Sequence, residues 1–135
     1  MAFMPWSNKL ATGIQSIDEQ HKWLVNATNQ LHDEINQPDP DNKRVESILE
    51  GLIEYTFNHF IVEEDLFKRF DYPQSKAHVE EHNKFTTTAA LLLSKFESGQ
   101  NVNNEALDFL KEWLKHHIMK ADMAYVPFLK AKGIQ

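Results

Sequence analysis

The chain has 135 residues, and 41% of them are hydrophobic, which is enough to build one buried core and predicts a single domain over residues 1–135. A formal net charge of −6 argues against a phosphate-binding surface of clustered lysines and arginines, so nucleic acid is not an expected partner. No apolar run approaches the roughly 20 residues needed to span a bilayer, and the first residues lack a signal-peptide pattern. We therefore expect a cytoplasmic protein that is not embedded in a membrane.

Residues 1–15 show no hydrophobic period, and we expect them to form an extended arm along the protein. Three apolar side chains would attach this arm: Phe3, Trp6 and Leu10. The first helix is predicted from Ser16 to about Gln37, because Ser16 and Glu19 form a capping-box pattern.

The second helix is predicted to begin after Asp41, a favourable N-cap residue, and to run to about Phe70. Its apolar residues recur at three-and-four spacing, which is typical of an amphipathic helix. The third helix is predicted from about Ser75, with Gly99 at the position of a C-terminal cap.

The fourth helix is predicted from about Asn103, and Pro127 is expected to disturb its continuation. Short breaks at 38–41, 71–74 and 99–103 join the four segments, which favours antiparallel neighbours. We therefore predict an all-α fold, an up-down-up-down four-helix bundle with an N-terminal arm and a short C-terminal helical extension.

Seven histidines and no cysteine mean that any bound metal must be held by imidazoles and carboxylates. His59 and Glu63 are four residues apart, as are His78 and His82, so each pair leaves one face of its helix. The other candidates lie on the first and fourth helices: His21, His117 and Asp122. Every predicted helix thus offers at least one ligand to a common interior.

A single helical histidine is more often a surface or hydrogen-bonded core residue than a ligand, and we interpret His32 and His116 in that way. Two spaced pairs together with histidines on both other helices favour a metal site. One spacing is irregular, because His117 and Asp122 differ by five and would lie about 140° apart on an ideal helix. Either they approach a dinuclear site from opposite sides or the helix is locally widened.

The set of donor atoms narrows the choice of metal ion. Five imidazoles and two carboxylates exceed the needs of one tetrahedral zinc and are too rich in nitrogen for calcium or magnesium. Two first-row transition ions fit better, and carboxylates can bridge two ions. Glu63 and Asp122 are the natural bridges.

The order of these residues along the chain resembles the hemerythrins, from His21 through the His59–Glu63 and His78–His82 pairs to His117 and Asp122. The resemblance covers nearly the whole chain and implies two iron ions joined by an oxo or hydroxo bridge. It implies that one iron is bound by three histidines, which are His78, His82 and His117. It implies that the other is bound by His21 and His59 and keeps a position open for oxygen, while Glu63 and Asp122 bridge the two.

The function implied by the resemblance is reversible binding of molecular oxygen for storage, buffering or delivery. Five apolar residues match pocket positions of the family, although they would also pack the core of any bundle: Leu24, Phe60, Trp113, Leu114 and Ile118. Tyr125 could donate a hydrogen bond near the site or cap the end of the bundle.

Two other functions stay open. A di-iron enzyme that reduces oxygen, peroxide or nitric oxide is disfavoured, because such bundles usually carry Glu-x-x-His motifs and the proposed ligands show none. A sensor of oxygen or iron would need a separate output partner. We expect a monomer that is not an enzyme, with an oxygen-consuming enzyme as a possible recipient.

Overall fold

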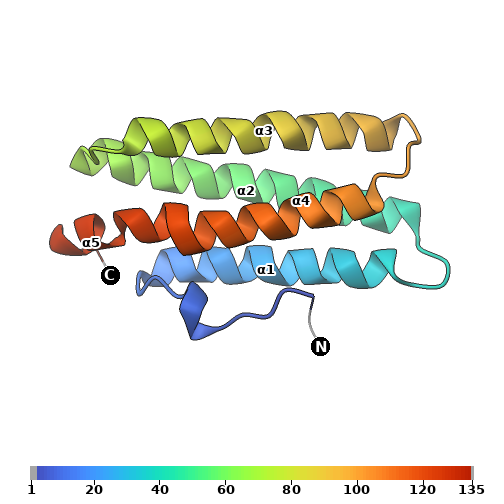
Figure 1. Cartoon of the computed structure of the whole chain (residues 1–135), viewed down its shortest axis with the longest axis horizontal. Helices are drawn as coiled ribbons and strands as arrows, with labels where there is room; N and C mark the ends of the chain where they lie inside the picture. The colour runs from blue at the N-terminus through green and yellow to red at the C-terminus, as the bar shows by residue number, and fades with distance from the viewer. Residues whose placement is uncertain (1–2, 135) are drawn as a thin grey trace.

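The computed structural model describes residues 3–134, so residues 1, 2 and 135, which the single-domain prediction included, lie outside the described range. Its elements in chain order are a short 3₁₀ turn, four long helices, a π-helical segment and a final helix. They are η1 (Asn8–Leu10), α1 (Gln15–Ile35), α2 (Asn42–Phe70), α3 (Ser75–Glu97), α4 (Asn103–His116), η2 (His117–Asp122) and α5 (Met123–Ala131). Figure 1 shows α1 to α4 side by side with nearly parallel axes, which confirms the predicted four-helix bundle and its C-terminal extension.

Each long helix buries one stripe of residues. On α1 the buried positions include Ile17, His21, Leu24, Thr28 and Leu31, which follow the three-and-four spacing of an amphipathic helix. Helix α1 packs against α2 and α4, and α2 packs against α3. Because the links at 36–41, 71–74 and 98–102 are short, consecutive helices run antiparallel and their buried stripes face one core.

The helix ends follow two of the three predicted signals. The side chain of Asp41 accepts hydrogen bonds from the backbone amides of Lys43 at 3.0 Å and Arg44 at 3.4 Å, which confirms it as the N-cap of α2. Gly99 has a φ of +90° and follows the last residues of α3, where its lack of a side chain permits the left-handed conformation.

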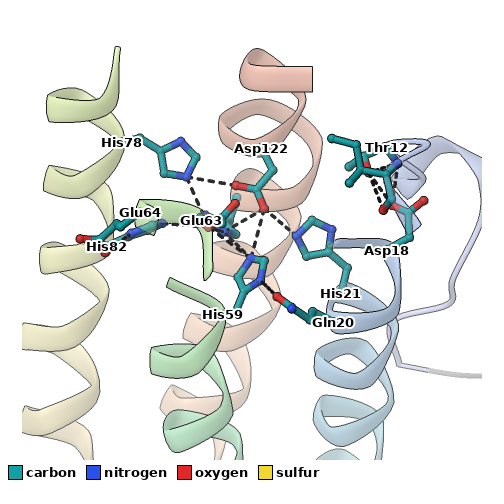
Figure 2. A network of polar contacts seen from close by, with 12 residues as sticks. Thr12, Asp18, Gln20, His21, His59, Glu63, Glu64, His78, His82 and Asp122 are labelled. Carbon is teal, nitrogen blue, oxygen red and sulfur yellow. Dashed lines mark hydrogen bonds and ion pairs between the residues drawn. The ribbon is translucent and has the colours of Figure 1, made fainter. Parts of the chain in front are cut away.

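The capping box at Ser16 was wrong. Helix α1 begins at Gln15, and no side chain caps its N-terminus. Instead, the carboxylate of Asp18 accepts hydrogen bonds from the backbone N–H groups of Thr12 at 2.7 Å and Gly13 at 3.1 Å. The hydroxyl of Thr12 also donates to Asp18 at 2.7 Å (Figure 2). The loop before α1 is therefore fixed by a carboxylate in the helix rather than by a cap before it.

The fourth predicted helix is divided by the π-helical segment η2, and α5 continues from it as the short extension. Pro127 lies inside α5, which continues past it to Ala131. Its missing N–H still removes one backbone hydrogen bond from this helix. The predicted arm is also present, with Leu10 buried in the core and Phe3 and Trp6 packed against it. Among residues 3–134, no helix combines the length and apolar character needed to cross a membrane.

Candidate metal centre

Seven polar side chains from α1, α2, α3 and η2 meet in the interior of the bundle. Figure 2 shows how those of His21, His59, Glu63, His78, His82 and Asp122 point toward one another. None of the seven is more than 5% exposed. They are the seven residues that the sequence singled out: His21 from α1, His59 and Glu63 from α2, His78 and His82 from α3, and His117 and Asp122 from η2. The four helices thus carry their histidines and carboxylates to one place.

Asp122 lies at the centre of one half of this cluster. Its Oδ2 atom is 2.5 Å from Nε2 of His21, 3.0 Å from Nε2 of His117 and 3.3 Å from Nε2 of His59. Its Oδ1 atom is 3.1 Å from Nε2 of His78. One carboxylate therefore faces imidazoles from four different segments of the chain.

Glu63 occupies the other half in the same manner. Its Oε1 atom is 3.1 Å from Nε2 of His82 and 3.2 Å from Nε2 of both His59 and His117. Nε2 of His78 lies 3.5 Å from the same oxygen. Because every one of these contacts uses Nε2, the imidazoles direct equivalent nitrogens toward the two carboxylates.

The donor atoms divide into two overlapping groups whose members all lie within 4.8 Å of one another. One group contains His21, His59, Glu63, His117 and Asp122, and the other contains Glu63, His78, His82 and His117. Two overlapping groups with shared members are the arrangement that a pair of adjacent metal ions requires.

The irregular spacing of His117 and Asp122 is resolved by η2. This segment is a π-helix, in which hydrogen bonds run between residues five apart and the turn is wider than in an α-helix. Residues separated by five therefore face nearly the same direction. Of the two explanations open from the sequence, local widening of the helix is the one observed.

Two histidines also have partners on their outward-facing nitrogens. Nδ1 of His59 lies 2.6 Å from Oε1 of Gln20, and Nδ1 of His82 lies 2.9 Å from Oε2 of Glu64. The sequence analysis missed Gln20 and Glu64. The available signal was their position, since each is the chain neighbour of a cluster residue.

The two carboxylates and two of the imidazoles have strongly shifted acidity. Burial alone would lower the pKa of His117 and His78, but the charges and hydrogen bonds of Asp122 and Glu63 outweigh it and raise the pKa to about 10 and about 9 respectively. Burial and repulsion from Asp122 would raise the pKa of Glu63, but the nearby imidazoles of His59 and His117 outweigh both effects and lower it. Burial alone would also raise the pKa of Asp122, but His117 and other histidines hold it well below its usual value.

His21 behaves differently, because burial lowers its pKa despite its contact with Asp122. Without metal, the raised pKa values of His78 and His117 therefore favour protonated rings beside the two carboxylates.

Several buried polar atoms lack a hydrogen-bond partner among the described residues. They include Nδ1 of His21 and of His117 and Oε2 of Glu63. Buried polar groups are nearly always paired, so an unpaired oxygen of Glu63 among converging imidazoles indicates a ligand that takes lone pairs. Neutral imidazole and carboxylate donors without sulfur suit iron and related first-row ions. The donor set therefore fits a pair of such metal ions.

Aromatic rings cover two of the histidines. Phe60 stacks on His82 with ring centroids 3.8 Å apart, and Trp113 stacks on His117 at 4.4 Å. Four of the five predicted pocket residues are buried in the main core cluster: Leu24, Phe60, Leu114 and Ile118. The fifth, Trp113, is partly exposed and packs against that cluster. The apolar residues thus line the side of the ligand cluster that faces the hydrophobic core and keep water away from it.

Three further residues from the sequence analysis lie outside the group of seven. His32 stacks on Phe3 at 4.3 Å, and His116 is exposed and lines a surface cavity of about 270 Å³ beside His78. Tyr125 is fully buried with its ring 5.6 Å from that of His78, and its hydroxyl lacks a hydrogen-bond partner among the described residues. Burial raises the pKa of Tyr125 well above its ordinary value, so the hydroxyl keeps its proton.

Fold and site together define a metal-binding four-helix bundle with a buried cluster of histidines and carboxylates. The family model of the hemerythrin HHE cation binding domain matches residues 12–129, and the chain belongs to this family. Membership supports a protein of the di-iron, oxygen-binding type.

Known proteins similar to the chain carry the same description. A bacteriohemerythrin of Methylococcus capsulatus is 34% identical over 133 residues, which cover 97% of this chain and all of that protein. A bacteriohemerythrin of Pseudomonas aeruginosa is 36% identical over 126 residues, which cover 93% of this chain and 81% of the relative. A crystal structure of wild-type hemerythrin superimposes with a TM-score of 0.87 at 33% identity, covering 93% of this chain and 97% of the other.

Proposed function

We propose that this protein binds molecular oxygen reversibly at two iron ions in the bundle core, and that it stores, buffers or delivers oxygen. The observation that carries the proposal is the convergence of five imidazoles and two carboxylates in an interior where each is at most 5% exposed. Burying so many ionisable groups is unfavourable unless a ligand compensates them.

The proposed ligand assignment is the one that the family resemblance implies, and Glu63 and His117 belong to both donor groups in the structure. We assign one iron to His78, His82 and His117 and the other to His21 and His59, with a bridging oxo or hydroxo group. Glu63 and Asp122 would bridge the two irons, which agrees with the contacts of each carboxylate to imidazoles on several segments. A ferrous pair supplies the two electrons that oxygen takes on binding and returns on release.

The chain's own residues favour return of the oxygen over its consumption. Chemical reduction of oxygen requires a supply of protons, and the surrounding side chains of Leu24, Phe60, Leu114 and Ile118 carry none. Tyr125 also has a buried hydroxyl, and its ring lies 5.6 Å from that of His78. His78 would hold the iron bound by three histidines, whereas the position open for oxygen is assigned to the other iron.

An oxygen-uptake assay separates a carrier from an enzyme. The iron-loaded, reduced protein is mixed with oxygenated buffer in a closed oxygen-electrode cell, with and without excess reductant. A carrier takes up about one oxygen per pair of irons and returns it under argon, and the reductant does not sustain uptake. Continuous uptake with reductant, accompanied by peroxide or water formation, would identify an oxygen-reducing enzyme instead.

We further propose that the chain acts as a single-domain cytoplasmic monomer and supplies an oxygen-consuming enzyme. The large apolar side chains exposed on the described surface are distributed over α1, α2, α3 and η2, which supports a monomer: Trp23, Phe57, Ile61, Leu91 and Met119. Light scattering of the iron-loaded protein tests this state, since a dimer would give about twice the chain mass of 15.8 kDa.

A further inference from the structure

The two histidines with outward partners follow one structural pattern. Gln20 precedes His21 on α1 and reaches across to His59 on α2. Glu64 follows Glu63 on α2 and reaches across to His82 on α3. In both cases a chain neighbour of an inward-facing cluster residue contacts the outward nitrogen of a histidine on the next helix, as Figure 2 shows.

These contacts fix the protonation pattern of each ring. Gln20 Oε1 and Glu64 Oε2 are acceptors, so Nδ1 of each histidine carries the proton and donates it outward. With a metal ion bound, Nε2 of His59 and of His82 would give its lone pair to the ion held between these rings and the carboxylates. Outer partners of this kind set the orientation and basicity of a metal-bound imidazole.

The two partners differ in charge. Glu64 offers a carboxylate whose side chain is 40% exposed, whereas Gln20 offers a neutral, half-buried amide at the shorter distance of 2.6 Å. A carboxylate draws the Nδ1 proton toward itself and makes the imidazole a stronger electron donor, while an amide does so much less. A stronger donor stabilises a ferric ion relative to a ferrous one.

We propose that Gln20 is a positioning residue for His59, which orients the ring while keeping it a weak donor and so preserves the ferrous state of the iron that His21 and His59 hold. This inference rests on the proposed function, because it assigns that iron to oxygen. The neutral amide gives geometric control of the ligand without the electronic effect that Glu64 exerts on His82.

Two substitutions separate orientation from electronic effect. Gln20→Leu removes the acceptor at similar size, and Gln20→Glu replaces the amide with a carboxylate. The matched control is Gln15→Leu, because Gln15 lies on the same helix and its exposed amide donates to Glu19 at 3.2 Å, away from the metal ligands. Each protein is loaded anaerobically with ferrous iron and then exposed to a ferrous chelator, and its midpoint potential is measured by spectroelectrochemistry.

Wild type and Gln15→Leu should each release two irons slowly and at the same rate. Gln20→Leu should release one of its two irons about 10–100-fold faster, since loss of an outer partner typically weakens metal binding by this factor. Gln20→Glu should retain both irons, but with a lower midpoint potential and faster oxidation in air.

Release of both irons from Gln20→Leu at the wild-type rate, or an unchanged midpoint potential in Gln20→Glu, would overturn the inference about Gln20. Failure of wild type to bind two irons contradicts the proposed function itself. The two results for the Gln20 variants are interpreted only when wild type has bound two irons. Failure of the inference about Gln20 is therefore distinguishable from failure of the proposed function.

Discussion

Asp122 is the residue whose neutralisation should disturb the metal-free protein most. Its two oxygens contact imidazoles of His21, His59, His78 and His117 at 2.5 to 3.3 Å in a fully buried setting. Asp122→Asn keeps the shape but removes the charge. Removing one partner of a buried ion pair costs roughly 3–5 kcal/mol, and we expect about 3 kcal/mol because an imidazole can release its proton in response.

The pH dependence of the free energy of unfolding gives a second test of the same buried charges. The raised pKa values of His78 and His117 mean that protonation stabilises the folded state fully below their ordinary pKa of 6.5, and that this stability is lost as the pH rises through about 9 and about 10. The lowered pKa of Glu63 acts oppositely, since its contribution is present above 4.5 and lost as the pH falls well below that value. In Asp122→Asn both histidine pKa values should fall, so the loss of stability above neutral pH should shrink.

Urea unfolding of the metal-free protein, followed by circular dichroism between pH 5 and pH 10, measures both effects. The control is Asp65→Asn, which makes the same substitution in an exposed pair with Arg69 and should change the free energy of unfolding by no more than about 1 kcal/mol. This account of the buried charges would be refuted if Asp122→Asn lowered the free energy of unfolding by less than about 1 kcal/mol. It would also be refuted if the free energy of unfolding of Asp122→Asn varied with pH in parallel with that of wild type.

Other predictions concern single residues of the site and the fold. His59→Ala should abolish oxygen binding while circular dichroism shows an intact fold, and retained binding would contradict the assignment of His59. Phe60→Ala, which removes a buried ring stacked on His82, should lower the free energy of unfolding by about 3–5 kcal/mol in urea. Gly13→Ala should lower the free energy of unfolding by about 1–2 kcal/mol, because φ is +83° at this residue. Gly51→Ala should raise it by about 0.5–1 kcal/mol, because this helical position has open space for a methyl group. A more stable Gly13→Ala than Gly51→Ala protein would contradict these backbone arguments.

The sequence predicts the helices well because their signals are local. Asp41 and Gly99 act through the backbone within a few residues, and the apolar stripes repeat over many turns. Ser16 fails as a cap because Asp18 binds the preceding loop through Thr12, and a local pattern does not distinguish these two uses of a helix start.

The site is predictable where several residues share a direction and unpredictable where one residue acts alone. Regular spacing indicates that His59 and Glu63 face inward together, but the spacing of His117 and Asp122 leaves two geometries open until η2 is seen. Gln20 is the chain neighbour of His21, but its partner His59 lies on another helix, so no sequence spacing predicts this contact.

Optical titration tests the central claim most directly. The metal-free protein is titrated anaerobically with ferrous iron, exposed to air and then flushed with argon through several cycles. The account predicts saturation at two irons per chain and a visible absorption band that develops in air and disappears under argon without loss between cycles. Saturation at one iron or none, or irreversible conversion to a ferric spectrum in the first cycle, would contradict reversible oxygen binding by this bundle.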